Sequence, residues 1–192
     1  NYIEIRRNCN GNGCDPSPAT SYSWTVAADP TAPTNTPTPS ASTVCVGAPL
    51  SVSAGGSSGG TGTCTYEYAI DPGTGTFGTW GATNSVTASG IGTYRIKSRM
   101  NCNGSGCDIS PETTTTWTVV ADPSAPTNTP TPAATTVCVG TSLSITASGS
   151  TGGTGTCTYE YAIDPGTGTF GSWGATNSVT ASGTGTYRIK SR

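Results

Sequence analysis

The sequence contains no histidine, and charged residues make up only 9% of its 192 residues. Histidine is the side chain whose ordinary pKa best suits proton transfer near neutral pH, so its absence removes the commonest general base. Serine and threonine are abundant, but without a base beside them they are poor nucleophiles. We therefore predict that the protein is not an enzyme and carries no catalytic residue.

Long runs of one kind of residue are also missing. The net charge is −2 and there is no basic stripe, which excludes the usual electrostatic surface for nucleic acid. No apolar run approaches the roughly 20 residues of a membrane-spanning helix, so we expect no membrane insertion. The sequence has no initiator Met, signal peptide or sorting tail, and we interpret it as mature chain or as a slice of a longer one.

Hydrophobic residues are scarce at 32%, whereas the sequence contains 27 glycines and 14 prolines among many threonines and serines. β-Branched threonine and turn-forming glycine disfavour helices and suit short strands joined by turns. A disordered, low-complexity chain is the alternative for such a composition. Because aromatic residues recur periodically and cysteines recur in pairs, we predict an all-β fold instead.

The eight cysteines carry information about location. In the absence of histidine the usual Cys/His zinc spacings do not occur, and the nearest approach is Cys102-x4-Cys107. Eight cysteines in a weakly hydrophobic, turn-rich chain predict four disulfides and therefore an oxidising, extracellular location. A cytosolic metalloprotein is the alternative. We expect no metal site and no cofactor.

The chain repeats itself with an offset of 93 residues. The window Cys45–Arg99 returns as Cys138–Arg192, and the two copies differ at only eight of 55 positions. Solenoid repeats span about 20–50 residues, whereas a unit of this size can hold its own core, as an immunoglobulin-like β-sandwich does. We therefore predict three parts: residues 1–30 as the last two strands of a preceding repeat, 31–123 as a complete repeat, and 124–192 as a repeat lacking its closing strand.

The ends of the sequence align with each other. Its first six residues map onto its last six, with Ile3 over Ile189. A natural protein rarely begins in the middle of a strand. We therefore expect the sequence to be a window on a longer repetitive polypeptide.

Two segments show the clearest strand periodicity. Residues 64–70, C-T-Y-E-Y-A-I, alternate large or apolar side chains with small or charged ones and return unchanged 93 residues later. Residues 92–100, G-T-Y-R-I-K-S-R-M, alternate in the same way, with Arg95, Lys97 and Arg99 on the outer face. We expect both segments to be half-buried strands of one sandwich, in a repeat of about six or seven strands.

The order of motifs resembles a known family. It runs V-C-V-G, a strand, C-T-Y-E-Y, then G-T-Y-R-I-K-S-R-x-N-C, four residues, C, and T-T-T-W-T-V-V-x-D-P. It resembles the immunoglobulin-like repeats of giant surface proteins of Bacteroidetes, and the resemblance covers both copies. Proteins of this kind include gliding proteins and adhesins and often leave the cell by type IX secretion. The resemblance implies tandem immunoglobulin-like domains in a protein that is secreted or attached to the cell surface.

Two functions fit such repeats. The first is a structural module of a long extracellular filament or adhesin stalk, with neighbouring repeats as partners and self-assembly into a fibre as an extension. The second is a glycan- or protein-binding module. Because the loops consist of Gly, Ser and Thr, which give little binding energy, we favour the structural role. Four aromatic side chains could form a sugar-stacking platform, although their alternation with polar residues favours core packing: Tyr66, Tyr68, Trp80 and Trp117.

The two periodic strands predict a register. We take them to be antiparallel neighbours, like the central strands of immunoglobulin-like sandwiches, and set Cys64 opposite Cys102, so that paired residue numbers sum to 166. Opposite charges then meet on the outer face, an arrangement that a slip of one residue would destroy. The predicted ion pairs are Glu67 with Arg99 and Asp71 with Arg95, and in the second copy Glu160 with Arg192 and Asp164 with Arg188.

This register predicts a Cys64–Cys102 disulfide and leaves Cys45 to pair with Cys107 by elimination. The second pair depends on strand order, which can place Cys45 at the far end of the sandwich. The competing arrangement joins Cys102 to Cys107 across a hairpin tip and Cys45 to Cys64.

Two acidic features could suggest chemistry. Glu67 and Asp71 lie four residues apart on one strand face and could be imagined as a glycosidase pair, but the arginines predicted opposite them favour ion pairs. Residues 71–76, D-P-G-T-G-T, have one carboxylate and many carbonyls, as part of a calcium loop does. A calcium site needs more acidic oxygens, so we predict a turn there.

Overall fold

The computed structural model describes residues 1–9 and 17–192. These residues form fourteen β-strands and no helix, so the prediction of an all-β fold is confirmed. The strands are β1 (Tyr2–Ile5), β2 (Thr20–Ser23), β3 (Thr34–Thr38), β4 (Thr43–Cys45), β5 (Pro49–Gly55), β6 (Cys64–Asp71), β7 (Ser85–Thr87), β8 (Gly92–Cys102), β9 (Thr113–Val120), β10 (Thr127–Thr131), β11 (Ser142–Ser148), β12 (Tyr161–Asp164), β13 (Ser178–Thr180) and β14 (Arg188–Ser191).

Strands β3 to β9 form two sheets that share one core. The first sheet has the strand order β3-β5-β7 and the second β4-β9-β8-β6. Leu50 and Val52 of β5 belong to the same buried cluster as Ile96 of β8 and Trp117 and Val119 of β9. Alternate residues of a strand point to the same face, so the period of two in these segments lets each sheet turn its apolar face inward.

The register of β6 and β8 is the one written from the sequence. Cys64 lies opposite Cys102 at one end of the pair, and Asp71 lies opposite Arg95 at the other. The far edge of β8 pairs with β9, which in turn pairs in parallel with β4. The Pro-rich segment before β4 supplies β3 at a sheet edge, where a missing N–H does little harm.

The C-terminal part repeats these pairings with the 93-residue offset. Thr127 lies opposite Ser148, as Thr34 lies opposite Gly55 in the middle of the chain. Strand β11 pairs with β13 as β5 pairs with β7, and β12 pairs with β14 in the register of β6 and β8. The counterpart of β4 in this part, residues 136–138, forms no strand.

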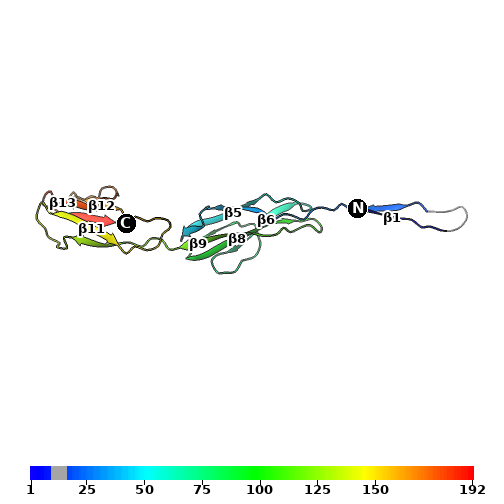
Figure 1. Cartoon of the computed structure of the whole chain (residues 1–192), viewed down its shortest axis with the longest axis horizontal. Coiled ribbons are helices and arrows are strands. Elements are labelled where there is room, and N and C mark those ends of the chain that lie inside the picture. Colours follow the sequence, from blue (N-terminus) through cyan, green and yellow to red (C-terminus); the bar gives the residue numbers. More distant parts are fainter. Residues whose placement is uncertain (10–16) are drawn as a thin grey trace.

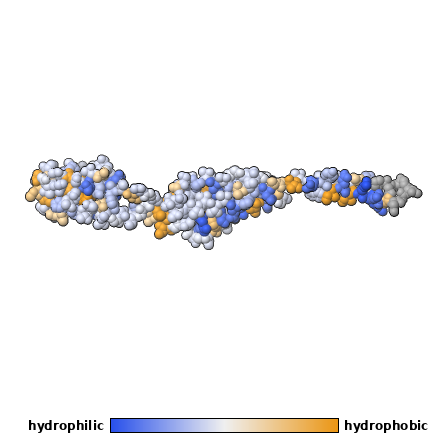
Figure 2. Space-filling view, in the orientation of Figure 1, coloured by the Kyte–Doolittle hydropathy of each residue, from blue (hydrophilic) through white to orange (hydrophobic). Residues whose placement is uncertain are grey.

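The N-terminal part is a hairpin of β1 and β2. Ile3 lies opposite Tyr22, and the side chains of Trp24 and Val26 beyond them are largely exposed. Figure 2 shows apolar patches beside strongly hydrophilic ones on this hairpin. Residues 10–16, which include Cys14, lie outside the described residues. The proposed division of the chain at residues 30 and 123 stays a prediction.

The three parts follow one another along a single axis (Figure 1). The hairpin extends from one end of the middle pair of sheets, and the C-terminal sheets lie beyond the other end. The outer face of the β6–β8 pair carries the charged residues singled out in the sequence.

Candidate functional site

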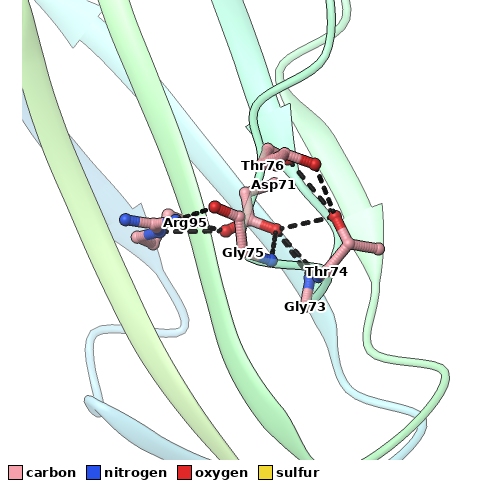
Figure 3. Close-up of polar contacts among 6 residues, drawn as sticks. All are labelled: Asp71, Gly73, Thr74, Gly75, Thr76 and Arg95. Atoms are coloured by element: carbon pink, nitrogen blue, oxygen red, sulfur yellow. Dashed lines mark hydrogen bonds and ion pairs between the residues drawn. The ribbon is translucent and has the colours of Figure 1, made fainter.

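Asp71 ends β6 and organises the turn that follows it (Figure 3). Its Oδ1 accepts hydrogen bonds from the backbone N–H groups of Gly73, Thr74 and Gly75, at 3.1, 2.9 and 3.0 Å. Gly73 and Gly75 have φ angles of 89° and 85°, which glycine adopts without steric cost. The segment is therefore a turn closed on a carboxylate, as the sequence predicted.

The second oxygen of the same carboxylate binds Arg95. Oδ2 of Asp71 accepts from Nε at 2.9 Å and from Nη2 at 2.7 Å, and Nη2 also donates to the carbonyl oxygen of Gly75 at 2.9 Å. Asp71 is fully buried. Burial raises its pKa, but the hydrogen bonds from Arg95 and from the turn outweigh burial and hold the pKa below that of an ordinary aspartate.

The second copy reproduces this arrangement. Asp164 is also fully buried and accepts the backbone N–H groups of Gly166, Thr167 and Gly168 on Oδ1. Its Oδ2 accepts from Arg188 Nε at 3.0 Å and Nη2 at 2.6 Å. The hydrogen bonds from Arg188 lower the pKa of Asp164 despite burial.

Glu67 lies two pairs further along the outer face, beyond the Ala69–Lys97 pair. Its Oε2 accepts from Arg99 Nε at 3.1 Å and Nη2 at 2.9 Å, and its Oε1 accepts from the side-chain amide of Asn101 at 2.9 Å. The hydrogen bond from Asn101, followed by Arg99, lowers the pKa of Glu67. In the second copy Glu160 accepts from Arg192 at 2.9 and 2.8 Å.

These contacts decide what the carboxylates can do. Each of the four carboxylates predicted to form an ion pair contacts its predicted arginine, and Asp71 and Glu67 have hydrogen-bond partners on both oxygens. A general acid needs a raised pKa, whereas Glu67 and Asp71 have lowered ones. Their geometry is therefore that of structural ion pairs.

Two aromatic side chains cover the outer cations. The guanidinium of Arg95 and the ammonium of Lys97 lie 4.8 and 4.5 Å from the ring centre of Phe77, and Arg99 lies 4.2 Å from that of Trp80. Cations at these distances are attracted by the ring faces. In the second copy Phe170 contacts Arg188 and Lys190, and Trp173 contacts Lys190 and Arg192.

Sequence reasoning did not place Phe77, and it favoured the core for Trp80. The loop after β6 returns along its free edge, where Gly81 exchanges two backbone hydrogen bonds with Tyr68 and Gly78 donates to Ile70. This carries Phe77 and Trp80 over the outer face. The available signal was the row of three outward cations, because cations attract the faces of aromatic rings.

The four aromatic residues considered as a sugar platform do not form one surface. Trp117 is 1% exposed in the core, and Tyr68 packs against the same core from the inner face of β6. The hydroxyl oxygen of Tyr66 accepts the backbone N–H of Ser57. Trp80 stacks on Arg99 at the opposite face of the sheet. Core packing is therefore confirmed for Trp117, whereas it is wrong for Trp80.

Cys64 and Cys102 form a disulfide between neighbouring strands. The predicted Cys45–Cys107 bond is wrong, because both residues are free thiols. Cys45 lies beside Val120, close to the start of β8, whereas Cys107 follows the end of that strand. The strand has 11 residues and is about 33 Å long. A disulfide needs Cα atoms within about 7 Å, so Cys45 and Cys107, at opposite ends of β8, are too far apart to form one.

The competing disulfide arrangement is also wrong, because Cys102 is bonded to Cys64. Cys107 instead donates to the carbonyl oxygen of Ala27 at 3.7 Å, and a hydrogen bond to Asp29 followed by burial raises its pKa. Cys138 and Cys157 are free thiols as well, so the expectation that all eight cysteines pair is wrong for these residues too.

The segment that enters the middle sandwich is hydrogen-bonded to it. Gly60 donates its backbone N–H to the carbonyl oxygen of Ala28 at 2.9 Å, and Thr31 donates to that of Ser58 at 2.8 Å. The same bonds recur 93 residues later, from Gly153 to Ala121 and from Ser124 to Thr151, both at 2.8 Å. We call residues 27–31 and residues 120–124 the two junctions.

The described residues include no cluster of three or more Cys, Asp or Glu side chains that could hold a metal ion. In the same part of the chain, no helix is long and apolar enough to cross a membrane. Comparison with known proteins found no matching family model and no matching curated protein.

Proposed function

We propose that the protein is a structural repeat module of a long extracellular filament or adhesin stalk. In this proposal each repeat is an immunoglobulin-like sandwich, and the chain acts as a mechanical spacer without catalysis. The observation that carries the proposal is the pair of junctions. A linker that binds the next unit through backbone hydrogen bonds holds its orientation better than a free Gly/Ser linker does.

The distribution of charge supports this role. The outer-face carboxylates are neutralised by arginines, and the cations are in turn covered by aromatic rings. Such groups satisfy one another within one unit and leave little unpaired charge for a ligand. Each feature returns 93 residues later, as expected for a spacer in which every unit has the same task.

The location we propose is extracellular, on the cell surface or secreted. The Cys64–Cys102 disulfide supports an oxidising compartment, where such bonds persist. The resemblance to surface repeats of Bacteroidetes supports export by type IX secretion. Neighbouring repeats of the same protein are the partners in this account.

A second candidate is a glycan- or protein-binding module. It is favoured by Trp80 and Trp173, which lie on the outer faces, partly exposed, rather than in the core. Aromatic faces stack on sugars, but here each face is already occupied by an arginine. A glycan array with the wild-type chain and with Trp80→Ala distinguishes the two functions, since binding that depends on Trp80 supports the second.

Single-molecule force spectroscopy tests the structural role. The middle sandwich should unfold in a discrete, force-resisting step, because strands β6, β8 and β9 must separate together. Cys64 and Cys102 are 38 positions apart, and the residues between them stay locked until the disulfide is reduced. Reduction should therefore lengthen this step by about 13 nm, at about 3.6 Å per residue. Extension without a resisting step would contradict a mechanical role.

A further inference from the structure

The outer face of the β3-β5-β7 sheet is built from hydroxyl side chains. Alternate residues of these strands pack toward the core, and the residues between them point outward. Every outward position carries a hydroxyl group except those of Pro49 and Gly55. We call the residues at the other outward positions the hydroxyl face: Thr34, Thr36, Thr38, Ser51, Ser53, Ser85 and Thr87.

The strand register places these hydroxyl groups side by side. Thr38 lies opposite Ser51, and Ser51 lies opposite Ser85, so one row crosses all three strands. Thr36 and Ser53 form the next row. Side chains directly opposite each other on one face of a sheet are about 4.5–5.5 Å apart, so the rows form a continuous polar surface.

This surface carries no charge. No charged residue lies between Asp29 and Glu67 or between Asp71 and Arg95, and the three strands lie within these two segments. The ion pairs described above lie on the β6–β8 pair of the other sheet. A soluble domain usually has charges on about a quarter to a third of its surface, and they keep separate molecules from associating. The hydroxyl face therefore needs another source of hydration.

The second copy keeps hydroxyl groups where its sequence changes. Three of the eight differences between the two copies fall on outward positions of this sheet, and each places a hydroxyl group in the second copy. Pro49 is replaced by Ser142, Ser53 by Thr146, and Gly55 by Ser148. The two copies therefore share the chemistry of this face rather than the size of its side chains.

Strand β3 offers the most accessible of these hydroxyl groups. It is an edge strand, and the side chains of Thr36 and Thr38 are exposed. Each of the two threonines precedes a proline, Pro37 or Pro39. Exposed segments rich in threonine, serine and proline are typical of O-glycosylated stalks. Thr36 and Thr38 are thus the hydroxyl groups best placed to accept a sugar.

We propose that Thr36 and Thr38 carry O-linked glycans, as do their exposed counterparts Thr129 and Thr131 in the C-terminal repeat. The donor is a sugar whose anomeric carbon is esterified to the phosphate group of a nucleotide or lipid carrier, and a glycosyltransferase catalyses the transfer. The threonine Oγ1 attacks the anomeric carbon and forms a new C–O bond. The C–O bond to the phosphate breaks, the carrier phosphate leaves with the electron pair, and a base of the transferase takes the hydroxyl proton.

Glycans at these positions supply the missing hydration. A sugar brings many hydroxyl groups and stands above the flat face, so it prevents the uncharged sheets of neighbouring molecules from packing together. It also covers β3, an edge strand with which another chain could pair. The inference rests on the extracellular location proposed above and adds a covalent modification to it.

A second row of exposed threonines provides the contrast. Thr114 and Thr116 lie on the outer face of β9, opposite Lys97 and Arg95. They are exposed as Thr36 is, but charged side chains already hydrate that face, and no proline adjoins them. The proposal therefore places no glycan on Thr114 or Thr116.

Peptide mapping of the protein collected from the medium or from the surface of the cells that produce it tests the proposal. After reduction, cleavage before aspartate residues yields peptides 29–70 and 122–163, which contain the proposed sites, and peptide 108–121, which contains the contrasting threonines. The first two should be heavier than their sequences by whole sugar residues, and the third should not. Mild alkali, which eliminates sugars from threonine and serine but not from asparagine, should remove the extra mass. Electron-transfer fragmentation should locate it on the four proposed threonines.

The double variant Thr36→Val/Thr38→Val removes both hydroxyl groups and keeps the β-branched shape that suits a strand. When it is produced in the same cells, its peptide 29–70 should lose the extra mass. The matched control Thr114→Val/Thr116→Val should retain the extra mass on that peptide in full. Mapping of the wild type needs no variant, so a variant that fails to fold leaves the test intact.

Peptides 29–70 and 122–163 at the masses of their sequences, or sugars attached only to other residues, would overturn the proposal. A Thr36→Val/Thr38→Val variant that keeps the full extra mass on peptide 29–70 would overturn it as well. These results leave the extracellular location untouched, because the protein is collected outside the cells. Protein found only in the cytoplasm would instead contradict the location, and the modification with it.

Discussion

Asp71 and Arg95 face each other across β6 and β8 and form a two-bond ion pair, at 2.9 and 2.7 Å. The other oxygen of the same carboxylate holds the turn at residues 73–75. One buried side chain thus joins a strand, its neighbour and the loop that carries Phe77 over the outer face. The equivalent Asp164 and Arg188 do the same in the second copy.

Replacing Asp71 with alanine should lower the free energy of unfolding by about 1–3 kcal/mol, because three backbone N–H donors and Arg95 lose their acceptor. Asp71→Asn can keep an oxygen for the turn, but its NH2 group then faces Arg95, so it loses the charge and both hydrogen bonds of the ion pair. It should cost less than Asp71→Ala because the three turn donors keep their acceptor. Urea denaturation measures both changes. If Asp71→Ala is as stable as the wild type, the turn does not depend on the carboxylate.

Stability should fall in acid. The folded-state pKa values of Asp71 and Glu67 lie below their ordinary values, so the unfolded chain takes up protons first as the pH falls. Their contribution is complete above the ordinary pKa of about 4 and is lost as the pH drops through the lower folded values. Thermal melts should show a constant Tm between about pH 8 and pH 5 and a decline below about pH 4.

The variant Asp71→Asn provides the comparison for the acid effect, because it removes one of the titrating groups. Its Tm should decline less steeply over the same acidic range. A wild-type Tm that stays constant down to about pH 2 would contradict the assignment of these carboxylates.

Removing the disulfide should destabilise the middle sandwich. The double variant Cys64→Ser/Cys102→Ser should lose about 2–4 kcal/mol and become sensitive to protease, and reduction of the wild type should have the same effect. Limited proteolysis with and without reductant measures this. The control is Cys45→Ser, which removes a free thiol and should change stability by less than about 1 kcal/mol. Unchanged protease resistance after reduction would count against the prediction.

The junction should depend on Gly59. Its φ is +84°, and a Cβ at this position would collide with the carbonyl oxygen of Asp29. Gly59→Ala should therefore release the linker and broaden the distribution of molecular lengths in small-angle X-ray scattering. Gly75→Ala is the matched control, because its φ is +85° but a Cβ there meets no atom within 4 Å. Equal scattering from both variants would show that this junction does not orient the hairpin relative to the middle sandwich.

The sequence was sufficient to predict the β6–β8 register because three features agree on it. The Cys64–Cys102 pair and the two opposite-charge pairs on the outer face require the same offset between the strands. The alternation of inward and outward side chains excludes a slip of one residue. Cysteines and opposite charges at matching spacings can be recognised within two short segments of the sequence. The register can therefore be recognised before the rest of the sheet is known.

The errors came from features that depend on the order of strands and the path of loops. Pairing Cys45 with Cys107 assumed that every cysteine is bonded, whereas the parallel β4–β9 pairing separates them by the length of β8. Trp80 was assigned to the core because the aromatic residues considered with it alternate with polar ones. Its loop carries no strand period, so nothing local indicates which face of the sheet it covers.

Immunogold electron microscopy of native cells, with an antibody raised against residues 31–123, tests the proposed structural role most directly. The account predicts gold particles along extracellular fibres or surface stalks, repeated along the length of each one. Label confined to the cell interior, or label on the surface without any fibre or stalk beneath it, would contradict the account.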